Sequence, residues 1–222
     1  MKKVAIIHTS SVSVVDLKSL FSEIIPNVEL INIIDDSLLA EVIKNNDITP
    51  AVISRMCTYV KIAESLGADL ILNQCSSVGE SADIARKCVS TKFLKVDEPM
   101  AVRAVELGSK IGVIATVSST VKPSCNLIKN TATMMNKEVT VTSYLVENAL
   151  DILMKEKNIE KHNMLVLNEI KKAALVNDVV VLAQGSMITM LPYLNNFGKP
   201  VLTSPRMAVE TIKRMLDERG GK

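Results

Sequence analysis

The sequence has few aromatic residues and no excess of charge of either sign. Its 222 residues include no tryptophan, and the aromatic residues together make up only 3%. Surfaces that stack nucleic-acid bases and cages that bind quaternary ammonium groups are built from such rings, so neither is expected. The 26 lysines and arginines nearly balance the 24 aspartates and glutamates. We therefore expect no nucleic acid and no anionic membrane as a partner.

Long hydrophobic runs are also absent from the sequence. No apolar stretch approaches the roughly 18 residues that a membrane-spanning helix needs. The apolar run after Met1-Lys2-Lys3 ends at His8, which is too short for the core of a signal peptide. We expect a cytoplasmic protein. With 48% hydrophobic and 23% charged residues, the composition is that of a globular chain with room for one generous domain or two small ones.

The residue patterns of metal and nucleotide sites are missing too. The cysteines stand 18, 13 and 37 residues apart with no C-x-x-C pair, and only two histidines could join them, so we expect no metal. The loop from His8 to Ser13 contains no glycine, which excludes the dinucleotide fingerprint and the P-loop there. The G-x-S-x-G elbow of common serine hydrolases is absent as well. We expect no cofactor.

The sequence does contain a regular alternation of strand-like and helix-like segments. Residues 4–7 and 28–34 are apolar runs of strand character, and apolar residues between them fall at helical spacing. Pro50 and Gly67 bracket an amphipathic helix. A strand at 69–72, a polar turn at 73–77, a helix near 79–88, a strand at 93–96 and a helix from Pro99 to Gly108 follow. This order predicts a parallel sheet with helices on both faces.

The second half of the chain repeats the first. Residues 3–9 (KVAIIHT) align with 110–116 (KIGVIAT) at an offset of 107, and 67–72 (GADLIL) align with 176–181 (VNDVVV) at an offset of 109. We therefore predict an α/β protein of two pseudo-symmetric Rossmann-like lobes, residues 1–97 and 98–202, with a helix in 203–222 packing back on the first lobe. Ligands of open parallel sheets bind at the carboxyl ends of strands, so we expect the active site in the cleft between the lobes.

Cys75 is the most suggestive residue at a strand end. It directly follows a buried strand, and Ser76 and Ser77 can cap the helix that comes next. Backbone N–H groups at a helix start favour a thiolate, which predicts a lowered pKa and a usable base or nucleophile. The alternative is a small packing residue. We interpret the other three cysteines as packing residues: Cys57, Cys88 and Cys125.

Hydroxyl side chains gather in the other strand-end loops. Helix capping needs only one or two of them, and the surplus could hold a carboxylate together with backbone N–H groups. His8 is either a proton donor or a hydrogen-bonded structural residue. The hydroxyl residues are Thr9, Ser10, Thr116, Ser118, Ser119 and Thr120.

Four segments together resemble the cofactor-independent aspartate/glutamate/hydantoin racemase superfamily. They are Asn73-Gln74-Cys75-Ser76-Ser77, Asp97-Glu98-Pro99, residues 111–116 with Ser119-Thr120, and residues 182–187. The resemblance covers nearly the whole chain and implies a homodimer that works without pyridoxal phosphate. It also implies one cysteine in each lobe, six residues after an acid that opens a strand. One thiolate would remove the proton α to a carboxylate, and the other thiol would return a proton to the opposite face.

The second of these cysteines is missing. Cys75 lies six residues after Asp69, but the residue six positions after Asp178 is Gln184, which has no titratable proton. Three enzymatic interpretations stay open. The protein is an isomerase that pairs Cys75 with His8 or a water; a single-cysteine decarboxylase or other lyase; or a maleate-isomerase-like enzyme whose cysteine adds to an unsaturated diacid. A fourth interpretation is a non-catalytic binder of a small carboxylate.

We therefore predict an isomerase-type enzyme that acts on a small acid at the carbon next to its carboxylate. A pocket lined by hydroxyl groups accepts amino acids, hydroxy acids, malonates and hydantoins on similar terms, so these residues favour none of them as the substrate. The predicted catalytic residues are Cys75 and His8. The predicted substrate-binding residues are Thr9, Ser10, Ser76, Ser77, Thr116, Ser119, Thr120, Gln184, Gly185 and Ser186.

Overall fold

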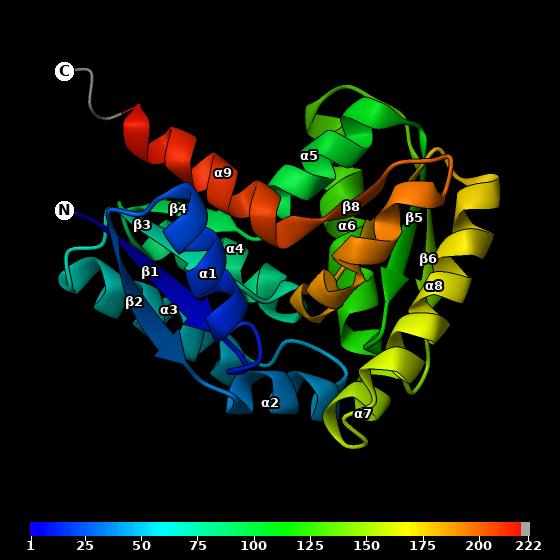
Figure 1. The fold of residues 1–222 in the computed structure, drawn as a ribbon. Helices are drawn as coiled ribbons and strands as arrows, with labels where there is room; N and C mark the ends of the chain where they lie inside the picture. Colours follow the sequence, from blue (N-terminus) through cyan, green and yellow to red (C-terminus); the bar gives the residue numbers. More distant parts are fainter. Residues whose placement is uncertain (219–222) are drawn as a thin grey trace. The chain divides into compact units, whose positions relative to one another are not determined.

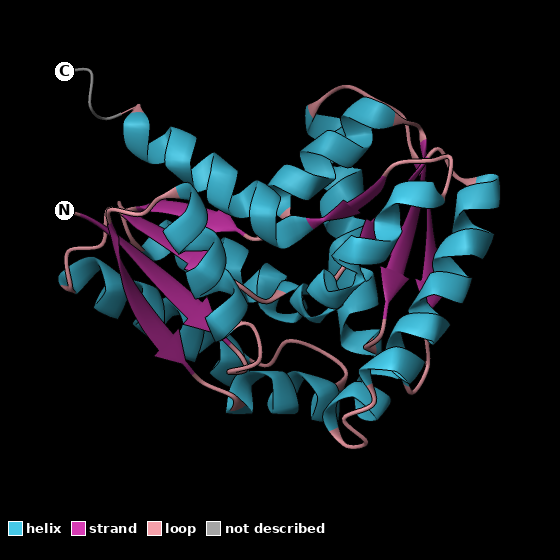
Figure 2. Cartoon of the chain, viewed as in Figure 1, coloured by secondary structure: helices cyan, strands magenta, loops and turns pink. Residues whose placement is uncertain are grey.

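The computed structural model describes residues 1–218, apart from the side chains of Met154, Ser186, Ile188, Thr189, Asn195 and Asn196. The chain divides into two compact units (Figure 1). Unit 1 holds Met1–Glu98 and the segment that begins at Pro205, and unit 2 holds Pro99–Ser204. Each unit contains one four-stranded parallel sheet with helices packed on it (Figure 2).

The sheet of unit 1 has the strand order β2-β1-β3-β4. Its strands are β1 (Lys2–His8), β2 (Val28–Ile34), β3 (Leu70–Asn73) and β4 (Lys92–Lys95). The central strands β1 and β3 are buried along most of their length, which is why their sequences are continuous apolar runs. The other elements are α1 (Val14–Ile24), α2 (Ser37–Asn45), α3 (Pro50–Ser65), the 3₁₀ helix η1 (Ser76–Val78), α4 (Gly79–Ala85), the 3₁₀ helix η2 (Arg86–Cys88) and most of α9 (Ser204–Asp217).

The two faces of the unit 1 sheet carry different side chains. Ile7 and Ile71 belong to an apolar cluster that includes residues of α2, α3 and α4. Because successive strand residues point to opposite faces, Ile6 lies on the other face, on which α1 lies (Figure 1). This alternation decides which side chains at the carboxyl edge of the sheet can meet.

The sequence signals for helix ends are confirmed at α3. Thr49 precedes the helix, and its hydroxyl oxygen accepts a hydrogen bond from the N–H of Val52 at 3.2 Å, while Pro50 occupies the first turn. Gly67 follows the helix with φ +76°, a left-handed conformation that favours glycine. The predicted helix from Pro50 to Leu66 is therefore observed as Pro50–Ser65.

Unit 2 repeats the architecture with the strand order β6-β5-β7-β8. Its strands are β5 (Lys110–Ala115), β6 (Thr140–Leu145), β7 (Val179–Leu182) and β8 (Val201–Thr203). Ile114 and Leu182 of this sheet pack with Val166 and Ile170 in one buried cluster. The helical elements are α5 (Glu98–Leu107), α6 (Ser118–Met134), α7 (Ala149–Met154), α8 (Ile159–Val176) and the 3₁₀ helix η3 (Gly185–Asn196).

The internal repeat extends to individual hydrogen bonds. The Asp69 carboxylate accepts the N–H of Lys3 at 2.9 Å, and the Asp178 carboxylate accepts the N–H of Lys110 at 2.8 Å. Val4 pairs with Leu70 in unit 1, and Ile111 pairs with Val179 in unit 2, at the offsets that the sequence predicts. The predicted fold class, two similar α/β lobes with parallel sheets flanked by helices, is confirmed.

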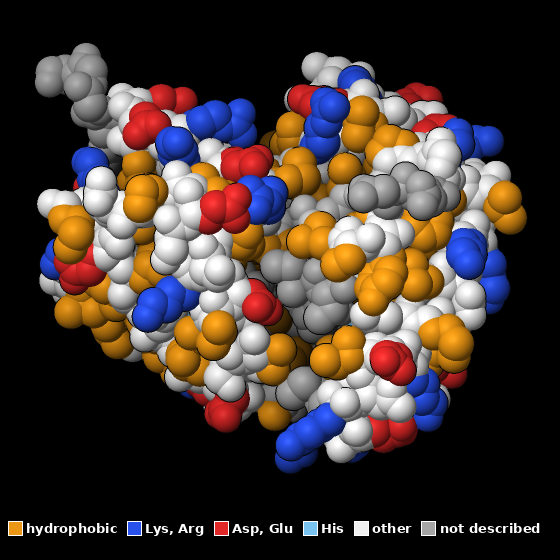
Figure 3. All heavy atoms as spheres, viewed as in Figure 1, with side chains coloured by type: hydrophobic (Ala, Val, Ile, Leu, Met, Phe, Trp, Pro, Cys, Tyr) orange, Lys and Arg blue, Asp and Glu red, His pale blue; other side chains and the backbone are white. Residues whose placement is uncertain are grey.

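Charged side chains of both signs are mixed on the face drawn in Figure 3. Lysine and arginine side chains lie interspersed with aspartate and glutamate there, in keeping with the small net charge of +2. Within residues 1–218, no helix combines the length and the apolar character that crossing a membrane requires.

A close approach makes Gly108 necessary at the corner between α5 and β5. A Cβ atom at this position would lie 2.4 Å from Cβ of Asp178, whose carboxylate also accepts the N–H of Ser109 at 3.0 Å. We expect Gly108→Ala to lower the free energy of unfolding by about 1 to 2 kcal/mol, because Asp178 must move. Urea denaturation measures the change.

Gly79→Ala is the matched control for this substitution. Gly79 lies in α4, and the nearest atoms to an added Cβ are 4.0 Å away, both at the flexible end of Lys95. We expect no loss of stability for this variant, since alanine favours the helix over glycine. Equal losses at both positions would contradict the role given to Gly108.

Candidate active site

Cys75 stands at the carboxyl edge of the unit 1 sheet, two residues after β3. It precedes η1, its backbone is extended (φ −117°, ψ 120°), and its side chain is half-buried. The Thr9 hydroxyl, the N–H groups of Ser77 and Val78 and the Ser77 hydroxyl are its hydrogen-bonding partners. The thiol is thus surrounded by donors from two neighbouring strand ends, as its position in the sequence predicts.

The pKa of Cys75 nevertheless moves opposite to the expected direction. Burial raises the pKa of the thiol, and this effect outweighs the hydrogen bonds from Thr9, Ser77 and Val78, which favour the thiolate. The prediction of a lowered pKa is therefore wrong, because it considered the local donors and not the desolvation that the fold imposes. At neutral pH, Cys75 is a thiol and can donate a proton.

Only one of the two hydroxyl residues predicted after β1 is a partner of Cys75. Thr9 is buried and contacts the thiol. The Ser10 hydroxyl instead accepts the N–H of Val12 at 3.2 Å, which stabilises the loop before α1. Ser10 thus has a local structural role in this conformation.

The structure does not bring His8 and Cys75 together. Ile7 belongs to the cluster that Cys75 also contacts, and strand alternation turns the His8 ring to the opposite face. There a 2.9 Å hydrogen bond joins His8 Nε2 to Oδ1 of Asn32. The ring is fully buried, and burial lowers its pKa against the effect of that hydrogen bond. The position fits the structural alternative, and a proton-donor role for His8 stays a prediction.

Asp97 is a site residue that the sequence reasoning missed. It follows β4 at the same sheet edge, next to Val96, whose N–H donates to the Asn73 carbonyl at 2.9 Å. Its side chain is only 4% exposed and accepts a hydrogen bond from the Ser76 hydroxyl, beside Cys75. In the sequence, the Asp97-Glu98-Pro99 segment contributes only to the family resemblance, and Asp97 is assigned no role in the site there. The available signal was an acid just after an apolar strand, on the edge that also carries Cys75.

Burial raises the pKa of the Asp97 carboxyl. The Ser76 hydroxyl and the positive charge of Lys95 oppose this rise, and the negative charge of Glu98 adds to it. Lys95 does not neutralise Asp97 directly, since its ammonium group donates to Asp83 at 2.7 Å. Two acids of unlike chemistry, a thiol and a carboxyl, each with a pKa that burial raises, are therefore joined through the Cys75-Ser76 segment.

In unit 2, Gln184 occupies the place that Cys75 has in unit 1. It lies two residues after β7, has an extended backbone (φ −136°, ψ 143°) and precedes η3. Its side-chain oxygen accepts the N–H of Thr116 at 2.6 Å and the Thr116 hydroxyl at 3.2 Å. The amide is thereby oriented with its oxygen held by the protein.

The remaining predicted residues of unit 2 also lie at the carboxyl ends of its strands. Thr120 is buried and Ser119 half-buried in the first turn of α6, and Gly185 begins η3. The Ser186 side chain lies outside the described residues.

The other three cysteines differ in exposure. Cys57 packs against the unit 1 core and Cys125 is half-buried. Cys88 is exposed, so its interpretation as a packing residue is wrong.

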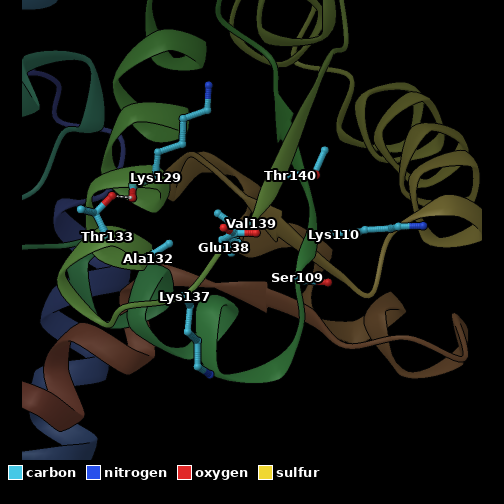
Figure 4. Close-up of a pocket in the computed structure, with 9 residues that line it drawn as sticks. All are labelled: Ser109, Lys110, Lys129, Ala132, Thr133, Lys137, Glu138, Val139 and Thr140. Carbon is cyan, nitrogen blue, oxygen red and sulfur yellow. Dashed lines mark hydrogen bonds between the residues drawn. The ribbon is translucent and has the colours of Figure 1, made fainter.

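A hollow of about 580 Å³ lies at the opposite end of the unit 2 strands. It is lined by residues at the start of β5 and β6 and the end of α6, and Lys110, Lys129 and Lys137 point away from one another there (Figure 4). Ligands of parallel sheets bind at the carboxyl ends, so this hollow is not the candidate site. Among the described residues, no three His, Cys, Asp or Glu side chains are grouped to hold a metal ion.

Comparison with known proteins gives a fold likeness only. No protein-family model matches the chain, and no curated protein sequence matches it. Solved structures do. A glutamate racemase from Bacillus anthracis superposes with a TM-score of 0.73 at 14% identity, over 99% of this chain and 83% of that one.

Two further racemases have the same fold. The aspartate racemase of Picrophilus torridus has a TM-score of 0.67 at 20% identity, over 96% of this chain and 94% of that one. The allantoin racemase of Klebsiella pneumoniae has a TM-score of 0.71 at 13% identity, over 99% of this chain and 89% of that one. These likenesses establish that the duplicated α/β fold of this chain is also the fold of racemases.

Proposed function

We propose that the chain is a cofactor-independent enzyme of the racemase type, which acts at the carbon α to the carboxylate of a small acid and uses Cys75 as its acid/base. The observation that carries the proposal is the Cys75 thiol, surrounded by the hydroxyl of Thr9 and the N–H groups of Ser77 and Val78 at a strand end. The fold is one that aspartate, glutamate and allantoin racemases share.

The proton transfer follows from the state of the thiol. In one direction the thiolate of Cys75, its minor form at neutral pH, removes the α-proton, and the C–H electron pair moves into the carboxylate to give an enolate-type dianion. The partner acid, His8 or a water, then returns a proton to the opposite face of the α-carbon. N–H and hydroxyl donors lower the energy of that dianion. In the reverse direction the partner is the base and Cys75 is the acid. Since burial raises the pKa of Cys75, its resting thiol is suited to that donation of a proton.

A single-cysteine lyase is the second candidate, and Gln184 favours it. In a decarboxylation the bond between the α-carbon and one carboxyl group breaks, CO₂ leaves, the electron pair stays on the α-carbon, and one acid protonates it. This reaction needs one thiol and no second base. Gln184, which occupies the unit 2 position equivalent to Cys75, cannot supply a proton.

The substrate-binding role extends to the remaining hydroxyl and amide residues as a proposal. In unit 1 it falls on Thr9, Ser76 and Ser77, which surround or flank Cys75. In unit 2 it falls on Thr116, Ser119, Thr120, Gln184, Gly185 and Ser186. A homodimer, which the resemblance implies, is part of the proposal, and a monomer in sedimentation equilibrium would remove that part.

Solvent-deuterium exchange tests the proposed function. The protein is incubated in D₂O with aspartate, glutamate, a hydantoin, a 2-hydroxy acid, an arylmalonate or maleate, and the reactions are followed by proton NMR. Loss of the α-proton signal without other change identifies an isomerase. Loss of CO₂ with uptake of one deuteron identifies a lyase, and formation of fumarate identifies a cis–trans isomerase. In each case the reaction must proceed in Cys125→Ala, which removes a half-buried thiol outside the site.

The fourth possibility, a binder without activity, needs its own readout. Slow alkylation of Cys75 does not identify a binder, because the raised pKa of the thiol predicts slow alkylation of an enzyme as well. Saturable binding of one of these acids, measured by calorimetry, with no exchange and no conversion of it would overturn the enzymatic proposal.

A further inference from the structure

Two adjacent acids after β4 have opposite environments. The Glu98 carboxylate accepts hydrogen bonds from Arg86 at 2.6 and 3.4 Å and from the N–H of Lys95 at 2.9 Å, so both of its oxygens have partners. Asp97 is 4% exposed, and its Oδ1 atom has no hydrogen-bond partner. Among residues 1–218, no cationic side chain lies within salt-bridge distance of it. A buried carboxyl with an unsatisfied oxygen is costly and needs an explanation.

The side-chain partner of Asp97 suggests that explanation. It is the hydroxyl of Ser76, which is itself only 7% exposed and follows Cys75 directly. No other described element gains an ion pair from Asp97. The side-chain interaction of this carboxyl is therefore directed to the segment that holds the candidate reactive thiol.

We propose that Asp97 is a positioning residue for the Cys75 site and acts by directing the Ser76 hydroxyl. An ionised Asp97 accepts a hydrogen bond from the Ser76 hydroxyl, so Ser76 can offer a ligand only its oxygen as an acceptor. A protonated Asp97 donates to the Ser76 oxygen instead and releases the hydroxyl hydrogen for a ligand carboxylate. The site then binds anions better when Asp97 is protonated. This inference rests on the proposed function, in which Cys75 reacts and the ligand is a carboxylate.

The charges around Asp97 allow such a protonated state. Lys95, at the end of β4, directs its ammonium group to Asp83 of α4. Glu98, at the start of α5, is paired with Arg86 of η2 and places a second negative charge beside Asp97. Desolvation and this like charge favour the neutral carboxyl, whereas the Lys95 charge and the Ser76 hydrogen bond favour the ionised one. Desolvation is the largest of these effects.

Alkylation of Cys75 by two probes of similar size tests the proposal. Iodoacetate is an anion and iodoacetamide is neutral, and peptide mass spectrometry gives the rate of each at Cys75. Both reagents react with the same thiolate, so the fraction of thiolate cancels when the iodoacetate rate is divided by the iodoacetamide rate. The change of this ratio with pH therefore reports how well the site accepts an anion. We expect this ratio to rise about five- to tenfold as the pH falls through the folded-state pKa of Asp97, which is the value of one hydrogen bond to an anion. The exposed Cys88 is the internal reference.

Three variants identify the route. In Asp97→Asn and in Ser76→Ala the ratio is expected to be independent of pH. In Glu98→Gln the ratio is expected to rise as in wild type but at lower pH, because a negative charge that raises the pKa of Asp97 is removed. A wild-type profile in Asp97→Asn would overturn the inference. So would a wild-type profile in Ser76→Ala, because Asp97 would then act as a bare charge and not through the hydroxyl.

The test still decides if one variant does not fold, and it does not depend on turnover of a substrate. Circular dichroism checks that each variant is folded, and if Asp97→Asn is not, Ser76→Ala alone decides, since it keeps the charge and removes the route. Alkylation requires no substrate. The proposed function can therefore fail in the exchange experiment while this inference stands. Conversely, exchange that depends on Cys75 together with a pH-independent alkylation ratio would support the proposed function and overturn this inference.

Discussion

Cys75→Ala is expected to lower turnover at least about 10³-fold while the protein stays folded. The substitution removes the group that holds the transferred proton, and general acid–base catalysis by a positioned side chain typically contributes about 10² to 10⁴. The side chain is half-buried and makes no ion pair, so the structural loss is small. The measurement is the initial rate of exchange or conversion with the best substrate of the panel, with unfolding in urea as the check on stability.

Cys75→Ser distinguishes a lost proton donor from lost packing. Serine nearly preserves the volume, and its oxygen can still accept the hydrogen bonds from Thr9, Ser77 and Val78. Its hydroxyl, however, is a far weaker acid than a thiol and cannot replace it in proton transfer. We expect Cys75→Ser to be as inactive as Cys75→Ala, and Cys125→Ala to keep its rate within about twofold. Activity of Cys75→Ala within about tenfold of wild type would show that the acid/base is another residue.

Much of the fold could be predicted from the sequence because its signals are local. The apolar runs of β1 and β3 mark central parallel strands, and Pro50 and Gly67 mark the ends of α3. Asp69 and Asp178 could be aligned because each directly precedes an apolar strand. In the structure both accept a backbone N–H at the start of the first strand of their unit. Chain order and periodicity are sufficient for such features.

The candidate site could be predicted only in part, since its chemistry depends on contacts between distant segments. The donors near Cys75 come partly from its own turn, which the sequence reveals, but the burial that raises its pKa comes from the packed fold. One interpretation of the sequence pairs Cys75 with His8, but strand alternation with Ile7 places His8 on the other face of the sheet. The burial of Asp97 and its bond to Ser76 join segments 21 residues apart (97 − 76), which no local pattern shows.

Asp97→Asn is expected to stabilise the protein at neutral pH by about 1 to 4 kcal/mol, the range found when buried ion pairs are replaced by neutral groups. The folded-state pKa of Asp97 lies above its unfolded value of 3.8. As pH rises from 3.8 through the folded pKa, the unfolded chain loses its proton first, so ionisation favours unfolding and stability falls across this window. Asparagine has no proton to lose, and its side-chain oxygen can still accept the Ser76 hydroxyl.

The gain must therefore depend on pH. Urea unfolding of wild type and Asp97→Asn is compared from pH 4 to pH 8, and the difference in free energy should be small at pH 4, grow with pH and level off above the folded pKa. Glu98→Gln, which weakens the pairing with Arg86, should destabilise instead. A gain independent of pH, or a loss, would mean that Asp97 is not the costly ionisable group described here. A pH-dependent gain would mean that the protein retains a destabilising acid beside Cys75, as a positioning role at a reactive site requires.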